Sequence, residues 1–214
     1  MPVKGVCEAK SCGAVICTLT DIQAEGEKKL QPQHHAEAQR RKWVPLGDDY
    51  LKIDIDGAFR KETAIGACRF IIRNCRGDPV MAGAANVSPM RDALMAETMA
   101  CQFALEAAEI HGISRIELET DSALLREALI TNSRDLEPEG ALFRSIRDLL
   151  ANQFRCDIIR NVPCSCNSVV HEITKVGMCW DIGQSDVWLD LPPEFVNSLV
   201  AHDLAEQLVL NPEP

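Results

Sequence analysis

The chain has 214 residues, 46% of them hydrophobic, with a formal net charge of -10 and an isoelectric point near 5.0. This length and composition suit one domain with a hydrophobic core and extensions. The acidic balance excludes a broad basic surface for polyanions, so any nucleic-acid binding must be local, weak or dependent on metal ions.

No stretch reaches the roughly 18 to 20 apolar residues of a membrane helix, and the N-terminus lacks the apolar core of a signal peptide. We therefore expect an intracellular protein, nuclear or cytoplasmic and not secreted, with no membrane contact. Cys7, Cys12 and Cys17 recur at five-residue intervals before His34-His35, but the close cysteine pairs of structural zinc sites are missing. All ten cysteines fit free thiols in a reducing compartment, so no disulfide-linked partner is expected.

The first elements in chain order are predicted to be strands. Residues 1–43 have no sustained periodicity and are expected to form a poorly ordered leader or linker. Alternating apolar and charged residues predict a strand over 50–59 with Asp54 and Asp56 on one face. Residues 64–74 and 80–87 are predicted strands separated by turn-forming residues, which gives an antiparallel meander.

Helices and strands alternate after the meander. Residues 91–111 are rich in Ala, Met, Leu and Glu and precede Gly112, which is typical of a helix and its C-terminal stop. Three- and four-residue spacing places Glu97 on the packing face of this helix. The remaining predictions are a strand at 113–120, helices at 122–132 and 138–151, a strand at 154–162 and a helix at 167–178.

This order predicts an α/β (α+β) domain over residues 44–179, with a five-stranded mixed sheet (βββαβααβα) flanked by helices. Residues 180–214 are expected to form a C-terminal extension that contains Pro192-Pro193 and an amphipathic helix over 194–210. This extension should pack on the domain edge or extend from it.

Three acids lie where the local pattern does not favour a free carboxylate. Asp56 is followed by Gly57, whose bare backbone allows close approach of a phosphate or metal, although a strand-ending Asp-Gly turn is an alternative. Glu97 is expected to be buried, which requires a ligand or a helix-to-sheet salt bridge. Asp121 follows a strand and can cap the next helix, which does not conflict with metal binding if different oxygens are used. Converging from three elements, these carboxylates can hold two divalent cations roughly 4 Å apart, the arrangement used in phosphodiester hydrolysis.

Five segments in chain order carry a resemblance to a known family: Leu51 to Phe59, Arg73 to Gly77, Ala96 to Ala100, Glu119 to Ser122 and Asn167 to Ile173. From about Trp43 to Gly177 the sequence resembles the ribonuclease H type 1 family. It is most similar to the branch of plant non-LTR retrotransposons, the reverse transcriptase-like ribonuclease H domain. One such segment is a weak signal, but all five in order are specific.

The resemblance implies a ribonuclease H-like fold and metal-dependent endonucleolytic hydrolysis of the RNA strand of RNA:DNA hybrids. Asp56, Glu97 and Asp121 would bind Mg²⁺ in a two-ion site, where Mn²⁺ can substitute. His171 falls at the family's fourth acidic position, where a neutral imidazole can shuttle a proton or assist product release. A helix-surface histidine is the alternative for that residue.

The resemblance also assigns substrate binding to Asn167, Ser122 and Gly57. Asn167 matches the position that contacts the substrate backbone near the scissile phosphate. Asp54, where the branch usually has Asn, is expected to support Asp56 rather than bind metal. Recognition of the hybrid would depend on its shape and 2′-hydroxyls, without sequence specificity. The protein is expected to be a monomer.

Several departures favour a second reading, a catalytically weak or inactive retroelement-derived domain that binds nucleic acid or a protein partner. Cys164 stands where the branch generally has Arg, which removes a phosphate contact. Val170 and Thr174 replace smaller residues in the final helix, and this can shift His171. No basic protrusion is visible between Asp121 and Phe154, so affinity for a hybrid should be poor.

Overall fold

The computed structural model describes residues 49–177, 180–189 and 194–210. The predicted leader over residues 1–43 lies outside this part. The elements follow in the order β1 (Leu51–Arg60), β2 (Ile65–Arg73), β3 (Pro79–Val87), α1 (Ala93–Ile110), β4 (Arg115–Thr120), α2 (Ala123–Ile130), α3 (Gly140–Gln153), β5 (Arg155–Asn161), the short 3-10 helix η1 (Cys164–Cys166), α4 (Ser168–Gly177), β6 (Ser185–Leu189) and α5 (Glu194–Leu210). The predicted order of elements is confirmed through α4.

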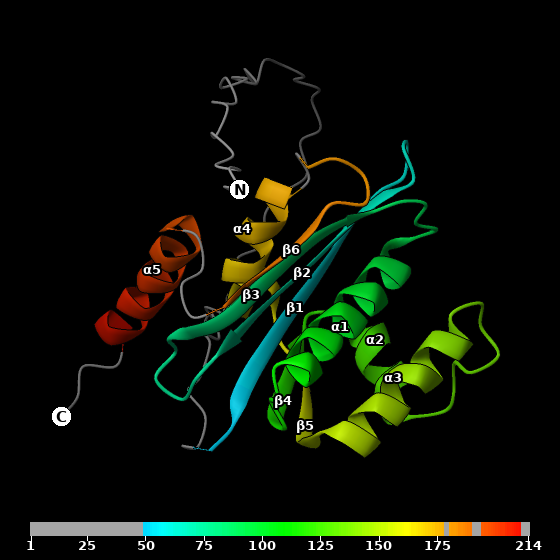
Figure 1. The fold of residues 1–214 in the computed structure, drawn as a ribbon, viewed down its shortest axis with the longest axis horizontal. Coiled ribbons are helices and arrows are strands. Elements are labelled where there is room, and N and C mark those ends of the chain that lie inside the picture. Colours follow the sequence, from blue (N-terminus) through cyan, green and yellow to red (C-terminus); the bar gives the residue numbers. More distant parts are fainter. Residues whose placement is uncertain (1–48, 178–179, 190–193, 211–214) are drawn as a thin grey trace, which may run out of the picture. The chain divides into compact units, whose positions relative to one another are not determined.

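The strands form one mixed sheet with the order β5-β4-β1-β2-β3-β6 (Figure 1). β1, β2 and β3 pair antiparallel as the predicted meander, whereas β4 lies parallel to β1 and β5 parallel to β4. The parallel pairing brings the end of β4 beside the middle of β1, since Asp54 is in register with Glu119. Residues that follow β4 therefore come close to those that follow Asp54.

The five predicted strands are confirmed, and β6 adds a sixth strand that the prediction did not include. β6 pairs antiparallel with β3, from Met81 opposite Leu189 to Ala85 opposite Ser185. This strand is five residues long, and most of its side chains are exposed at the sheet edge. A short edge strand with few buried positions carries little hydrophobic alternation, which explains why the pattern did not reveal it.

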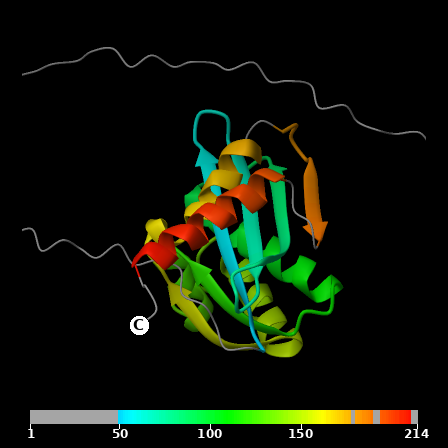
Figure 2. The ribbon, with the colours of Figure 1, turned by 90° about the vertical axis from the view of Figure 1, so that its left-hand side faces the viewer.

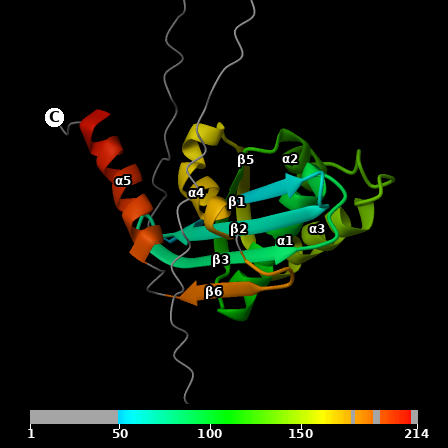
Figure 3. The same ribbon diagram turned by 90° about the horizontal axis from the view of Figure 1, so that it is seen from above.

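Helices cover both faces of the sheet (Figures 2 and 3). α1, α2 and α3 lie on one face over the larger core, which contains Ile53, Ile55, Phe70 and Leu105. α4 packs on the opposite face over β1, β2 and β3, and α5 packs against α4. The second core there contains Ile71, Ala82, Val169, Val170, Ile173, Val196 and Val200. The extension thus contributes both β6 and α5 to the folded part.

None of the helices in the described ranges is long and apolar enough to cross a membrane. Cys68, Cys75, Cys101, Cys156, Cys164 and Cys166 are free thiols. The N-terminal cysteines and His34-His35 lie outside the described residues.

Candidate metal centre

Asp56 lies in the middle of β1 and is 6% exposed. Ile53 and Ile55 belong to the core beneath α1, so the alternation of the strand directs Asp54 and Asp56 to the other side. β1 continues past Asp56 to Arg60, which excludes a strand-ending Asp-Gly turn at this point. The buried position of the carboxylate therefore needs another explanation.

Glu97 lies in the second turn of α1, and its backbone rests on β1 at Gly57. A Cβ on Gly57 would lie 2.3 Å from the Glu97 nitrogen and 2.4 Å from the carbonyl carbon of Ala96, so no side chain fits there. The Gly57 N–H donates a hydrogen bond to the Glu97 carboxylate. This close approach of α1 to β1 at Gly57 places Glu97 next to Asp56. Gly57 therefore has a packing role that the sequence did not reveal.

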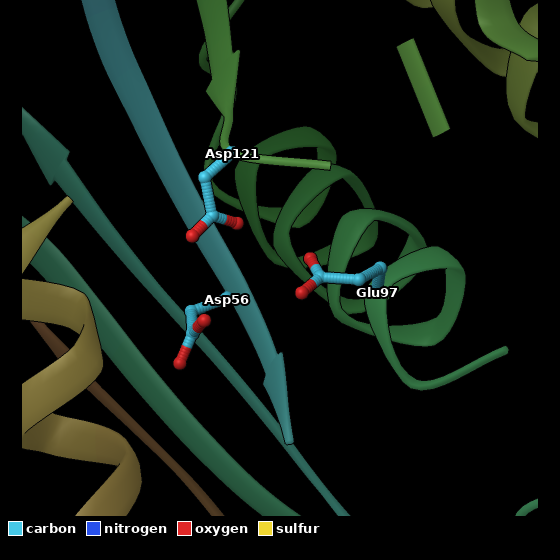
Figure 4. Close-up of side chains that lie close together, drawn as sticks. All are labelled: Asp56, Glu97 and Asp121. Carbon is cyan, nitrogen blue, oxygen red and sulfur yellow. The ribbon is translucent and has the colours of Figure 1, made fainter. Parts of the chain in front are cut away.

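Asp121 directly follows β4 and precedes α2. Ser122 is the N-cap of α2, because its Oγ accepts a hydrogen bond from Leu125 N at 3.2 Å. The prediction that Asp121 caps the helix was therefore wrong. Its carboxylate instead turns toward Asp56 and Glu97 (Figure 4).

The three acids form one cluster, in which a ligand oxygen from each lies within 4.8 Å of the others. Burial, reinforced by the charges of Asp56 and Asp121, raises the pKa of Glu97 to about 9, although the hydrogen bond from Gly57 opposes the shift. Glu97 is 9% exposed, and its Oε2 has no hydrogen-bond partner among the described residues. The alternative reading of Glu97, a helix-to-sheet salt bridge, is likewise not seen in this part of the chain.

A divalent cation fits this donor set. Hard oxygen ligands suit Mg²⁺ and Mn²⁺, and a cation would offset the repulsion among three adjacent carboxylates. It would also provide a partner for the unpaired Glu97 oxygen, whose burial is otherwise costly. The two-ion occupancy stays a prediction.

Two further residues assigned by the resemblance, His171 in α4 and Asn167 just before that helix, reach the same place. His171 Nδ1 lies 3.8 Å from Asp56 Oδ2, and the side chain is 62% exposed. Asn167 is 2% exposed, and its Nδ2 donates to the Ile55 carbonyl at 2.7 Å. Asn167 thus ties the start of α4 to β1 directly beside Asp56. The roles of these residues in catalysis and substrate binding stay predictions.

Two residues at the centre had no assigned role. The Cys164 side chain, exposed in η1, forms a hydrogen bond with Asp121 that raises the pKa of the thiol. Arg69 pairs across the sheet with Asp56, and its Nη1 donates to the carbonyls of Cys68 and Ala85. Burial lowers the pKa of Arg69 to about 10, while the charge of Asp56 opposes this shift. An arginine inside an otherwise apolar strand is the signal that could have identified it.

Charged side chains also fill the space between β1 and the helices α4 and α5. Lys52 Nζ contacts Glu119 Oε1 at 2.8 Å, and both side chains are buried. Arg73 Nη2 contacts Asp54 Oδ2 at 2.7 Å, while Arg73 Nη1 contacts Asp203 Oδ2 of α5 at 2.8 Å. Asp54 is therefore engaged by Arg73 and lies outside the tight acid cluster.

Comparisons with known proteins agree with this architecture. The model of the family described as "Reverse transcriptase-like" matches residues 54–177, which is more than half of the chain and includes every acid of the cluster. No curated protein matches the sequence.

Several solved structures are similar in fold. RNase H1 from the halophilic archaeon Halobacterium salinarum is 26% identical, with a TM-score of 0.51 over 60% of this chain and 97% of that one. The N-terminal RNase H domain of a Mycobacterium tuberculosis protein is 18% identical, with a TM-score of 0.53 over 60% and 93% of the two chains. LC11-RNase H1 in complex with an RNA/DNA hybrid is also 18% identical, with a TM-score of 0.54 over 59% and 95%. These likenesses confirm the predicted fold.

Proposed function

Because the chain belongs to the reverse transcriptase-like family of ribonuclease H domains, we propose that it is a metal-dependent endonuclease that hydrolyses the RNA strand of RNA:DNA hybrids. The observation that carries the proposal is the cluster of Asp56, Glu97 and Asp121, with its buried and unpartnered Glu97 oxygen. LC11-RNase H1, which shares the fold, has been solved with an RNA/DNA hybrid, and this supports the choice of substrate.

In this proposal Asp56, Glu97 and Asp121 hold Mg²⁺, or Mn²⁺ in its place. Bound cations would supply activation of a water for attack on the phosphate and stabilisation of the leaving oxygen. Gly57 orients Glu97 through its N–H, so that the carboxylate stays directed at Asp56. His171, beside Asp56 and open to solvent, can carry a proton between the site and bulk water.

Substrate contacts are assigned to the rim of the cluster. Asn167, Ser122 and Gly57 are the proposed contacts, although the Gly57 N–H already serves Glu97 and the Asn167 amide serves Ile55. Their contribution is therefore largely to hold the surface that the hybrid meets. With a net charge of -10, affinity should depend on bound cations, and recognition should follow hybrid shape rather than sequence.

The decisive experiment is cleavage of a labelled RNA:DNA hybrid by the full chain with Mg²⁺ or Mn²⁺. Asp121→Asn should abolish cleavage, because it removes a charge of the cluster while keeping the side-chain shape. Asp148→Asn, on the exposed face of α3, is the matched control and should cleave normally. Absence of cleavage by folded protein with either metal would refute the nuclease.

The second candidate is a catalytically inactive domain that derives from a plant retroelement and retains nucleic-acid binding. Cys164 is exposed beside Asp121, at a position where the resembled branch generally has a cationic Arg side chain. The loss of that positive charge favours the inactive domain. Hybrid binding by Asp56→Asn separates the two candidates. The nuclease predicts that cleavage is lost far more than binding, whereas equal loss of both would make Asp56 structural.

A further inference from the structure

Arg69 is a buried cation in the strand next to the metal centre. It is fully buried in β2, and its Cα pairs across the sheet with that of Asp56 in β1. Phe70 belongs to the core beneath α1, so the alternation of the strand directs Arg69 to the opposite face, which Asp56 also faces. The Cβ atoms of residues paired in this way lie about 5 Å apart. The guanidinium is therefore a close neighbour of the acid cluster.

The hydrogen bonds of Arg69 go to backbone carbonyls rather than to a carboxylate. Nη1 donates to the carbonyls of Cys68 and Ala85, whereas Nε and Nη2 have no partner among the described residues. Arginine keeps its proton in proteins, so the group is a permanent positive charge. Burial lowers the pKa of Arg69, and the charge of Asp56 opposes this shift, as expected for opposite charges within reach of each other.

Trp180 of the C-terminal extension packs on this charge. Its ring centroid lies 5.8 Å from Arg69 Cζ, within the range of a cation–π contact. Asn86 Nδ2 donates to the Trp180 carbonyl at 2.7 Å, which ties Trp180 to β3. A charge held away from water is screened less than one at the surface, because the local dielectric constant is lower. The field of Arg69 therefore reaches the acid cluster.

We propose that Arg69 is a built-in counter-charge of the metal centre, which weakens the binding of a divalent cation to Asp56, Glu97 and Asp121. Its positive charge offsets part of the repulsion among the three carboxylates and repels an approaching cation. Trp180 strengthens both effects by keeping water from the guanidinium. The inference rests on the metal site of the proposed function, but it does not require cleavage of a hybrid.

The test is a titration of the full chain with Mn²⁺, in which electron paramagnetic resonance measures the free ion. Arg69→Met removes the charge and keeps much of the side-chain length. It should tighten binding by at least about fourfold, the Coulomb factor for a unit charge about 10 Å from a divalent cation at the dielectric constant of water. Arg69→Lys keeps the charge but loses the guanidinium geometry, and it should bind Mn²⁺ like the wild type.

Arg115→Met is the matched control, because it removes the same charge from the exposed end of β4 opposite to Asp121. It should bind Mn²⁺ like the wild type. Trp180→Ala gives a second test that leaves Arg69 in place but opens it to water. It should tighten binding by about twofold, since the charge is then partly screened. Circular dichroism checks that each variant is folded.

Wild-type affinity in Arg69→Met, or in Trp180→Ala where Arg69→Met does not fold, would overturn the proposal. Equal tightening in Arg69→Lys and Arg69→Met would also overturn it, because the effect would then come from lost hydrogen bonds rather than from charge. Absence of Mn²⁺ binding in the folded wild type and in every variant has a different meaning. That result would refute the metal site of the proposed function, and this inference with it.

Discussion

The Gly57 N–H donates a hydrogen bond to the Glu97 carboxylate, and the Gly57 Cα lies so close to α1 that a Cβ there would stand 2.3 Å from the Glu97 nitrogen. This contact fixes the distance between β1 and the start of α1. Since Asp56 precedes Gly57, it also fixes the separation of two acids of the cluster. The geometry of the centre thus depends on the absence of a side chain at one position.

Gly57→Ala should therefore destabilise the fold and disturb the metal centre together. The added methyl group meets backbone atoms that cannot rotate away, so we expect a loss of about 3 kcal/mol in the free energy of unfolding, at the upper end of overpacking costs. Denaturant unfolding measures this loss, and metal affinity should fall in parallel.

Gly66→Ala is the matched control for that substitution, in the neighbouring strand β2. The three atoms nearest to a Cβ on Gly66 would all belong to the side chain of Met90, which can change its rotamer. We expect a cost of about 1 kcal/mol and no change in metal affinity. Equal effects of the two alanines would contradict a special role for the contact between Gly57 and α1.

Glu97 should make the stability of the metal-free protein depend on pH. Burial and the neighbouring acids raise its pKa from 4.5 to about 9 in the folded state, so the folded protein holds a proton that the unfolded chain releases. The stabilisation is complete below pH 4.5 and is lost as the pH rises toward 9. Thermal unfolding between these values should show a decreasing Tm, and Glu97→Gln should reduce the slope.

Glu109→Gln, on the exposed end of the same helix, is the control and should keep the wild-type slope. Divalent metal should also flatten the slope, because it replaces the proton on Glu97, and its affinity should increase with pH. A slope that is identical in the wild type and Glu97→Gln would show that Glu97 is ionised in the folded protein.

Much of the fold could be predicted because its signals are local. Alternation in β1, the helix composition around Glu97 and the Gly112 stop each depend on neighbouring residues, and Gly112 does adopt φ +72°. β6 was missed because a short and mostly exposed edge strand carries little hydrophobic alternation. The proximity of Cys164 to Asp121 and the cross-strand register of Arg69 with Asp56 were missed because they depend on tertiary structure.

Asn167→Ala should destabilise the protein, because it removes the buried hydrogen bond to the Ile55 carbonyl. We expect a loss of about 1 to 3 kcal/mol, the cost of leaving a buried acceptor unsatisfied. Asn161→Ala removes a comparable bond to the Thr120 carbonyl at 3.2 Å from an exposed side chain and should cost less. If Asn167 served only to bind substrate, Asn167→Ala would instead raise KM for the hybrid and leave the free energy of unfolding unchanged.

Arg73→Met should be among the most damaging changes on the α4 side of the sheet. It leaves the buried Asp54 carboxylate without its cation, so we expect a loss of about 3 to 5 kcal/mol in the free energy of unfolding. Asp203→Asn should cost about 1 to 2 kcal/mol, since Arg73 keeps Asp54 as its partner. Arg76→Met, which removes an exposed pair with Asp78, is the control and should change little.

His171→Ala distinguishes a proton-transfer group from a surface histidine. The side chain is 62% exposed, so the substitution should leave Tm nearly unchanged. If the imidazole beside Asp56 moves protons during hybrid cleavage, kcat should fall by about 100-fold, the lower end of general acid–base contributions.

His111→Ala, at the opposite end of α1 and about 20 Å along that helix from Glu97, should leave kcat per folded molecule unchanged. Equal kcat values for the wild type and His171→Ala would make His171 a surface residue, and the proton would then have to leave through water alone.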